Sequence, residues 1–119
     1  MSDVEIEELE RRLGEVKVVD VRQPYEYDGS YGAPCDPRQG HLPGAVNLNV
    51  DDLAGMSAED VAAHLGVEPG AEIVVYCHSG SRSARAATIL QRLGFEGRNY
   101  VGSWHEWSHD PSLPGELRD

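Results

Sequence analysis

The apolar run I-V-V-Y at residues 73–76 constrains the fold most, because a helical pattern begins only a few residues after it. Three further segments have the character of short strands: V-K-V-V-D-V at 16–21, residues 45–48 and residues 99–101. Short apolar runs bounded by turn residues are typical of strands buried in a sheet. These segments therefore predict a largely buried sheet.

Helical patterns lie between and around these strands. They cover residues 4–13, 24–28, 58–65, 81–93 and 102–108. Ser2 is placed to cap the first helix, and Gly94 follows the pattern at 81–93 as a stop. Alternating strands and helices imply right-handed β-α-β units. We therefore predict a single α/β domain over residues 1–119, with a central, mainly parallel sheet of about five strands and helices on both faces.

The charge distribution narrows the function. The formal net charge is −11, which argues against nucleic acids and anionic membranes as primary partners, since both require a basic face on the protein. Residues 77–98 are the exception, because they hold four arginines against Glu96 alone and so carry a net charge of +3. An acidic chain with one basic segment predicts a local site for a small anion.

Signals for membrane insertion or export are not found in the sequence. No stretch approaches the ~18 to 20 consecutive apolar residues that a membrane span needs. The acidic start M-S-D-V-E-I-E-E-L-E lacks the basic and apolar regions of a signal peptide. We therefore expect a cytoplasmic protein.

The chain has two cysteines, Cys35 and Cys77, which are too few for a disulfide framework. The five histidines show no spacing typical of a structural zinc site, so we expect two free thiols, no metal site and no cofactor. Cys35 lies in the Gly- and Pro-containing stretch at 28–40, which is predicted to be a long loop. It is either an incidental thiol or a resolving thiol that forms a disulfide with Cys77.

Cys77 ends the most apolar strand and precedes a very short loop. In parallel sheets, ligands bind beyond the carboxyl ends of the strands. Inward-pointing amides of a tight loop, and the N-terminus of the next helix, would lower the pKa of a thiol there. Gly80 permits the turn, and the small side chains of Ser79, Ser81 and Ser83 leave its centre open. The guanidinium of Arg82 could donate bidentate hydrogen bonds to the oxygens of a bound anion.

Two reactions of a cysteine thiolate suit such a site: phosphoryl transfer through a phosphocysteine and sulfur transfer through a persulfide. Cysteine phosphatases share a C-x5-R loop that is wide enough for a tetrahedral phosphate. The spacing from Cys77 to Arg82 is C-x4-R, one residue shorter. The shorter loop favours one additional sulfur atom over a phosphate, and a phosphatase is the less favoured alternative.

Four segments, in order along the chain, carry a resemblance to a known family. They are V-V-D-V-R-Q-P-Y-E-Y (18–27), G-H-L-P-G-A-V-N-L (40–48), V-Y-C-H-S-G-S-R-S-A (75–84) and N-Y-V-G-S-W-H-E-W-S (99–108). Together they resemble the rhodanese family of sulfurtransferases, in particular the C-terminal, catalytic halves of thiosulfate and mercaptopyruvate sulfurtransferases. The resemblance spans nearly the whole chain and implies a rhodanese-like α/β fold.

The resemblance also implies a two-step reaction that needs no metal or organic cofactor. Thiolate Cys77 would attack the outer sulfur of thiosulfate and release sulfite, and cyanide or a thiol would then accept sulfur from the resulting persulfide. The amides of residues 78–82 would stabilise that persulfide. Tyr25 and Glu26 stand where mercaptopyruvate-using relatives place an arginine, which disfavours a carboxylate donor. The alternative role is that of a sulfur-relay module, which receives persulfide sulfur and passes it to a protein acceptor.

Two arginines have alternative roles. Arg82 is expected to bind the substrate anion, with a structural salt bridge as the alternative. Arg22 follows the first strand at the same edge of the sheet. It is expected either to bind substrate or to pair with Asp20 or Glu26 and so fix the turn.

The sequence also suggests roles for the aromatic residues near these motifs. We expect His78 to shape the rim of the site, because the side chains of adjacent residues rarely reach each other and a Cys77–His78 dyad is therefore disfavoured. Trp104 is expected either to form a wall of the substrate pocket or to lie in the core. His41 is expected to hydrogen-bond within its own Gly- and Pro-containing turn.

Overall fold

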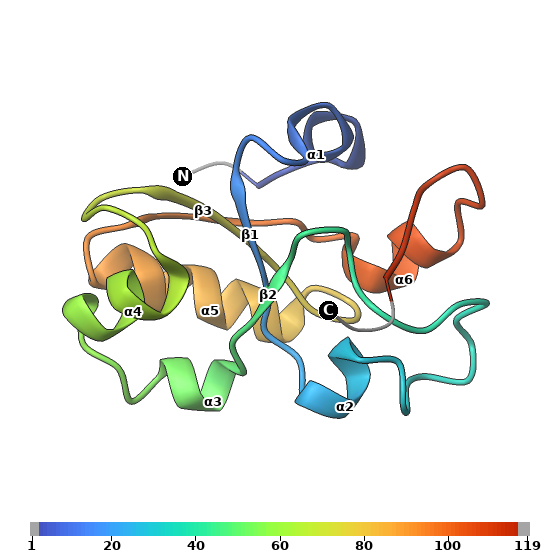
Figure 1. Cartoon of the computed structure of the whole chain (residues 1–119), viewed down its shortest axis with the longest axis horizontal. Helices are drawn as coiled ribbons and strands as arrows, with labels where there is room; N and C mark the ends of the chain where they lie inside the picture. Colours follow the sequence, from blue (N-terminus) through green and yellow to red (C-terminus); the bar gives the residue numbers. More distant parts are fainter. Residues whose placement is uncertain (1–2, 117–119) are drawn as a thin grey trace.

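A four-stranded parallel sheet forms the centre of the computed structural model, which describes residues 3–116 (Figure 1). Its strands, in the order β2-β1-β3-β4, are β1 (Lys17–Asp20), β2 (Val46–Asn47), β3 (Glu72–Tyr76) and β4 (Glu96–Asn99). The pairings are parallel, which confirms the predicted α/β class. The expected number of strands was about five. Within the described residues, Val4 and Tyr100 add an isolated bridge next to β4 instead of a fifth strand.

Six helices occur among the described residues. They are α1 (Ile6–Arg12), α2 (Pro24–Tyr27), α3 (Val50–Leu53), α4 (Ala58–Leu65), α5 (Ser81–Arg92) and α6 (Ser103–Ser108). Helices α3, α4 and α5 lie together on one side of the sheet, whereas α1 and α6 pack on the other (Figure 1). None of these helices is long and apolar enough to cross a membrane.

The helices differ from the predictions in two places. Helix α1 begins at Ile6, two residues later than predicted, with Glu5 at its N-cap position, and the cap expected of Ser2 lies outside the described residues. The short helix α3 was not predicted. It begins after Asn49, whose side chain accepts a hydrogen bond from the amide of Asp51, so that a polar cap defines a helix too short to show a period.

Alternate residues of β3 and the position after it point into two separate cores. Ile73, Val75 and Cys77 belong to the core beneath α3, α4 and α5, whereas Val74 and Tyr76 belong to the core beneath α1 and α6. Each of the five is at most 1% exposed. A strand that is buried on both faces needs apolar residues at every position, which explains the unbroken apolar run in the sequence.

Strand β4 begins three residues before the strand predicted at 99–101. Its sequence, E-G-R-N, lacks the apolar pattern on which such predictions rest. Gly97 packs so closely on α5 that an added Cβ would lie 2.8 Å from a backbone oxygen of that helix. Arg98 forms ion pairs with Glu8 at 2.7 Å and with Glu72 at 2.8 Å. Close backbone packing and ion pairs therefore fix this strand.

The register of the sheet positions the candidate site. Asp20 at the end of β1 lies opposite Tyr76 at the end of β3. The segments that follow these two strands therefore emerge side by side at one edge of the sheet, where parallel sheets bind their ligands. Cys77 and Arg22 both lie in these segments.

Candidate active site

Cys77 directly follows β3, and α5 begins four residues later at Ser81. The loop between them turns sharply at Gly80, whose φ of +99° lies in the left-handed region. A Cβ at this position would lie 2.7 Å from the carbonyl oxygen of Val101. The turn therefore requires glycine, because any other L-residue would be strained and would clash with backbone.

The loop folds back so that its donors surround the Cys77 sulfur. The backbone amide of Gly80 donates to Sγ at 3.1 Å. Ser83, in the first turn of α5, donates from its amide at 3.4 Å and from its hydroxyl at 3.3 Å. Cys77 is 1% exposed, so these hydrogen bonds are shielded from bulk water.

These contacts set the acidity of the thiol. Burial alone would raise the pKa of Cys77. Hydrogen bonds from the Ser83 hydroxyl and from the amides of Ser83, Gly80 and Ser79 oppose burial, and the net pKa lies below the ordinary value for a thiol. Ser81 begins α5 with an exposed side chain. A larger fraction of Cys77 is therefore thiolate at neutral pH than of a free cysteine.

The start of α6 anchors the backbone of the loop. The hydroxyl of Ser103 accepts a hydrogen bond from the Cys77 amide at 3.0 Å. The amide of Trp104 donates to the Cys77 carbonyl at 2.9 Å, and the amide of His105 donates to the carbonyl of the next loop residue, His78, at 3.0 Å. Ser103 has a φ of +56°, which is uncommon for a residue other than glycine. A strained residue thus holds the backbone on which the reactive sulfur sits.

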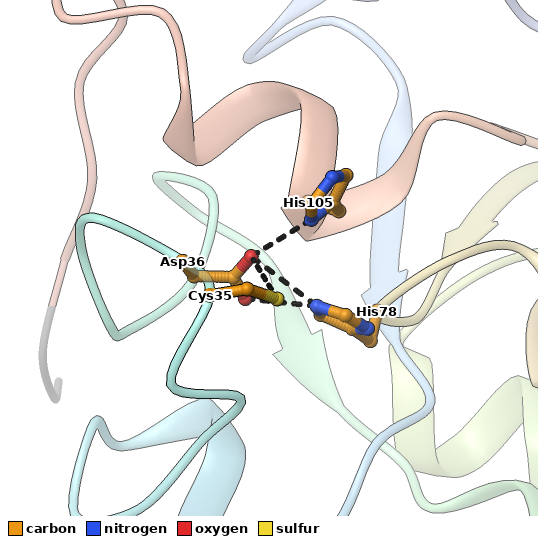
Figure 2. A group of neighbouring side chains, drawn as sticks. All are labelled: Cys35, Asp36, His78 and His105. Atoms are coloured by element: carbon orange, nitrogen blue, oxygen red, sulfur yellow. Dashed lines mark hydrogen bonds and ion pairs between the residues drawn. The ribbon is translucent and has the colours of Figure 1, made fainter.

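His78 lies at the rim of the loop with its side chain 24% exposed. Its Nε2 is turned toward Asp36, at 3.2 Å from Oδ1 and 3.0 Å from Oδ2. His105 of α6 contacts the same carboxylate from Nδ1 at 3.0 Å, and Cys35 lies beside it (Figure 2). The Nε2 of His78 therefore faces a carboxylate at the rim of the site.

Arg82 lies in the first turn of α5 and forms a salt bridge across to α2. Its Nη1 and Nη2 donate to the Glu26 carboxylate at 2.8 and 3.1 Å. Burial would raise the pKa of Glu26, but the hydrogen bonds from Arg82 lower it below its ordinary value, so the pair is ionised at neutral pH. The salt bridge that was the alternative for Arg82 is present, and any substrate anion has to compete with Glu26 for this guanidinium.

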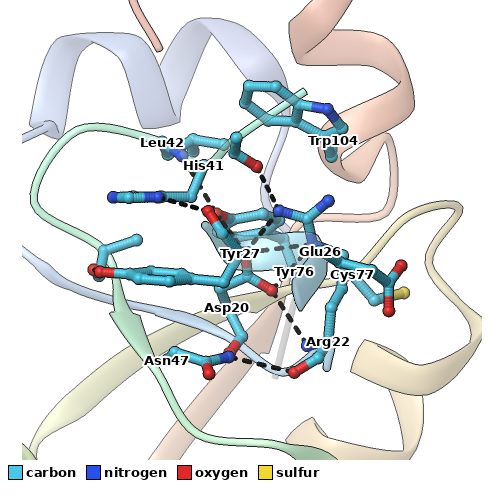
Figure 3. Close-up of polar contacts among 12 residues, drawn as sticks. Asp20, Arg22, Glu26, Tyr27, His41, Leu42, Asn47, Tyr76, Cys77 and Trp104 are labelled. Carbon is cyan, nitrogen blue, oxygen red and sulfur yellow. Dashed lines mark hydrogen bonds and ion pairs between the residues drawn. The ribbon is translucent and has the colours of Figure 1, made fainter. Parts of the chain in front are cut away.

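Arg22 adopts the structural alternative of its two predicted roles. Its Nε and Nη2 donate to the Asp20 carboxylate at 2.9 and 2.6 Å, and Nη2 also donates to the carbonyl of Gly40 (Figure 3). The residue is 1% exposed, and its guanidinium lies 5.4 Å from the centre of the Trp104 ring. The structure favours pairing over substrate binding, because a buried guanidinium that is already paired presents no free face to an anion.

Trp104 and His41 also serve the fold. Trp104 is fully buried in the core beneath α1 and α6, and its Nε1 donates to the carbonyl of Arg38 at 2.9 Å. Of its two predicted positions it takes the core. The ring of His41 stacks on Tyr27 with centroids 3.7 Å apart, and its Nδ1 donates to the Tyr27 carbonyl at 2.7 Å. This ring contact joins the turn to α2 and differs from the bond predicted within the turn itself.

Three polar residues at the site were missed from the sequence as partners of the loop. Ser83 carried a usable signal, because a serine in the first turn of the predicted helix can direct both its amide and its hydroxyl to the loop. Ser103 and Asp36 carried none. They are distant from Cys77 in the sequence, and only tertiary packing brings them to the loop.

Comparison with known proteins points to one family. The family model described as Rhodanese-like domain matches residues 5–110. Thiosulfate sulfurtransferase of Pseudomonas aeruginosa is 32% identical over 124 residues, which cover 93% of this chain and 44% of the relative. Thiosulfate sulfurtransferase of Corynebacterium glutamicum is 37% identical over 117 residues, which cover 87% of this chain and 39% of the relative.

A solved structure agrees with these matches. The crystal structure of a probable thiosulfate sulfurtransferase superposes with a TM-score of 0.81 at 42% sequence identity, covering 96% of this chain and 47% of that chain. This chain thus spans less than half the length of the proteins it matches. The family model covers residues 5–110 and the fold agrees with that solved structure, so the chain belongs to the rhodanese family.

Proposed function

We propose that this domain transfers the outer sulfur of thiosulfate to a thiophilic acceptor through a persulfide on Cys77. The observation that carries the proposal is the set of hydrogen bonds to Sγ, from the Gly80 amide and from both donors of Ser83, at 3.1 to 3.4 Å. Fixed donors of this kind stabilise negative charge on sulfur during transfer. The relatives named thiosulfate sulfurtransferase support thiosulfate as the donor.

The proposed reaction consists of two displacements at sulfur. In the first, the Cys77 thiolate attacks the outer sulfur of thiosulfate, a new sulfur–sulfur bond forms, and sulfite leaves with the electron pair of the bond that breaks. In the second, cyanide or an acceptor thiolate attacks the terminal sulfur of the persulfide, and the Cys77 thiolate is the leaving group. No external oxidant is consumed, and the covalent intermediate divides one difficult transfer into two easier ones.

The charges around the loop favour a second candidate. The pKa of Arg82 is raised by its hydrogen bonds to Glu26 and also by the charge of Cys77, so the guanidinium is electrostatically coupled to the sulfur. Glu26 offsets that positive charge and repels a dianion such as thiosulfate. A sulfur-relay module, whose persulfide is loaded by a protein donor and passed to a protein acceptor, would not need a free cation here. The same Cys77 persulfide serves both candidates.

Replacing the nucleophile tests the proposed activity. With thiosulfate and cyanide as substrates, the wild-type domain should form thiocyanate. Cys77→Ser should reduce the rate by at least about a thousandfold, because a serine hydroxyl is not ionised at neutral pH. Cys35→Ser, assayed in metal-free buffer, is the matched control and should retain the wild-type rate. An active Cys77→Ser variant would contradict the assignment, whereas a wild type that is inactive with thiosulfate but accepts sulfur from a cysteine desulfurase would favour the relay module.

The hydroxyl of Ser83 should set the pH dependence of the thiol. Ser83→Ala removes a donor that stabilises the thiolate, so the pKa of Cys77 should rise. Because the thiolate is the reactive form, the profile of alkylation rate against pH should move to higher pH, with a rate about 3- to 10-fold slower at pH 7. Peptide-resolved mass spectrometry with iodoacetamide separates the reaction of Cys77 from that of Cys35.

The matched control for this variant is Thr88→Ala, which removes an exposed hydroxyl on the same helix that donates to the carbonyl of Ala84. It should leave the profile of Cys77 in place. A Ser83→Ala profile that stays at the wild-type position, or that moves to lower pH, would show that the hydroxyl does not stabilise the thiolate.

The Glu26–Arg82 pair should limit the use of free thiosulfate. Glu26→Gln keeps an oxygen that can cap α2 but removes the negative charge, so kcat/KM for thiosulfate should rise by about 3- to 10-fold at low ionic strength and by less at high salt. Asp51→Asn is the matched control, because it makes the same change in net charge by releasing Arg85 of α5 from an exposed ion pair. An equal rise in both variants would indicate a general charge effect, and no rise with Glu26→Gln would show that this carboxylate does not select the donor.

A further inference from the structure

Four side chains with the chemistry of metal ligands meet at the rim of the Cys77 loop. Cys35 and Asp36 come from the long loop, His78 from the loop after β3 and His105 from α6. Figure 2 shows them directed toward one another from three separate segments. Their donor atoms all lie within 4.8 Å of one another. We call these four residues the rim cluster.

We propose that the rim cluster binds a divalent transition-metal ion of the zinc class. One thiolate, two imidazoles and one carboxylate form a donor set that Zn²⁺ accepts in tetrahedral geometry. Bonds of about 2.0 to 2.3 Å place neighbouring donors in such a site roughly 3.3 to 3.8 Å apart. The side chains therefore need only small rotations to close around an ion. Mg²⁺ and Ca²⁺ prefer oxygen ligands and do not suit this set.

The environment of the Asp36 carboxylate independently favours a cation at this position. Its side chain is fully buried, and Oδ1 lies 3.0 Å from His105 Nδ1 and 3.2 Å from His78 Nε2. Oδ2 lies 3.0 Å from His78 Nε2 yet takes part in no hydrogen bond with any described residue. A buried carboxylate oxygen that accepts no hydrogen bond costs free energy. A metal ion between the carboxylate and the imidazoles would coordinate this oxygen.

The remaining ligands make the cluster accessible. Cys35 is exposed, and the side chain of His105 is 49% exposed, so an ion can enter from solvent without a change in the core. The sequence predicted no metal site because zinc motifs are recognised by ligands a few residues apart. Here Cys35, His78 and His105 are separated by tens of residues, and the fold alone brings them together.

A bound ion would tie the long loop to the active-site loop. His78 directly follows Cys77, and the His105 amide already donates to the His78 carbonyl at 3.0 Å. The ion would fix the side chain of His78, hold the segment that carries Cys35 beside it and place positive charge at the rim. The proposal does not rest on sulfur transfer, because the four ligands are present whatever reaction Cys77 performs.

Titration of the full chain with Co²⁺ tests the proposal, since tetrahedral cobalt absorbs visible light and a thiolate ligand adds charge-transfer absorption. The Cys77→Ser variant is the parent protein, so that Cys35 is its only thiol. Both absorptions should saturate at one ion per chain. Adding Cys35→Ser should abolish the charge-transfer absorption, and adding His105→Ala should weaken binding by at least about tenfold.

His64→Ala is the matched control, because His64 is an exposed histidine on α4 outside the rim cluster. It should leave both absorptions unchanged. Zn²⁺ should displace the cobalt and raise the melting temperature of the Cys77→Ser parent, but not that of the parent carrying Cys35→Ser. No cobalt absorption, or a charge-transfer absorption that survives Cys35→Ser, would overturn the proposal. If His105→Ala binds cobalt as tightly as the parent but is less stable than the parent in the presence of a chelator, the role of Asp36 is instead to hydrogen-bond the two histidines, and the proposal is wrong.

Discussion

The site depends on one constraint: the chain must turn from β3 into α5 within a few residues while directing its donors at the Cys77 sulfur. Gly80 meets this constraint, because its positive φ and its contact with Val101 leave no room for a side chain. The turn is held from outside as well. Ser103 accepts from the Cys77 amide at 3.0 Å, and Asn99 donates to the Gly80 carbonyl at 3.2 Å. Packed backbone therefore places the sulfur, and long, mobile side chains contribute little.

The electrostatic field of the site is weaker than the count of charges in the sequence suggests. Three of the four arginines in residues 77–98 are paired: Arg82 with Glu26, Arg85 with Asp51, and Arg98 with Glu8 and Glu72. Stabilisation of negative sulfur then comes mainly from amides and a hydroxyl, which are neutral donors. Such donors stabilise a thiolate or persulfide without strongly attracting free anions. In the proposed reaction, we therefore expect the Arg82–Glu26 pair to influence which sulfur donor the site accepts.

The fold and the position of Cys77 were predictable because they follow from local patterns. An unbroken apolar run and a helical period are properties that every buried parallel strand and covering helix must show. Partners chosen by tertiary packing leave no such pattern. A salt bridge of Arg82 and the pairing of Arg22 with Asp20 could therefore be offered only as alternatives, and neither Glu26 as the partner of Arg82 nor the place of Asp36 beside two histidines could be predicted. Gly97 of β4 was missed for a related reason, since close packing selects a residue without the apolar character of a strand.

Whether Cys77 carries sulfur is the central question, and intact-protein mass spectrometry after incubation with thiosulfate answers it without any assumption about the acceptor. We expect an added mass of about 32 Da, one sulfur atom, on the wild type and on Cys35→Ser. The added mass should be absent from Cys77→Ser and should disappear when cyanide is supplied. A wild type that gains no mass, or an adduct that persists in Cys77→Ser, would contradict a persulfide on Cys77 formed from thiosulfate.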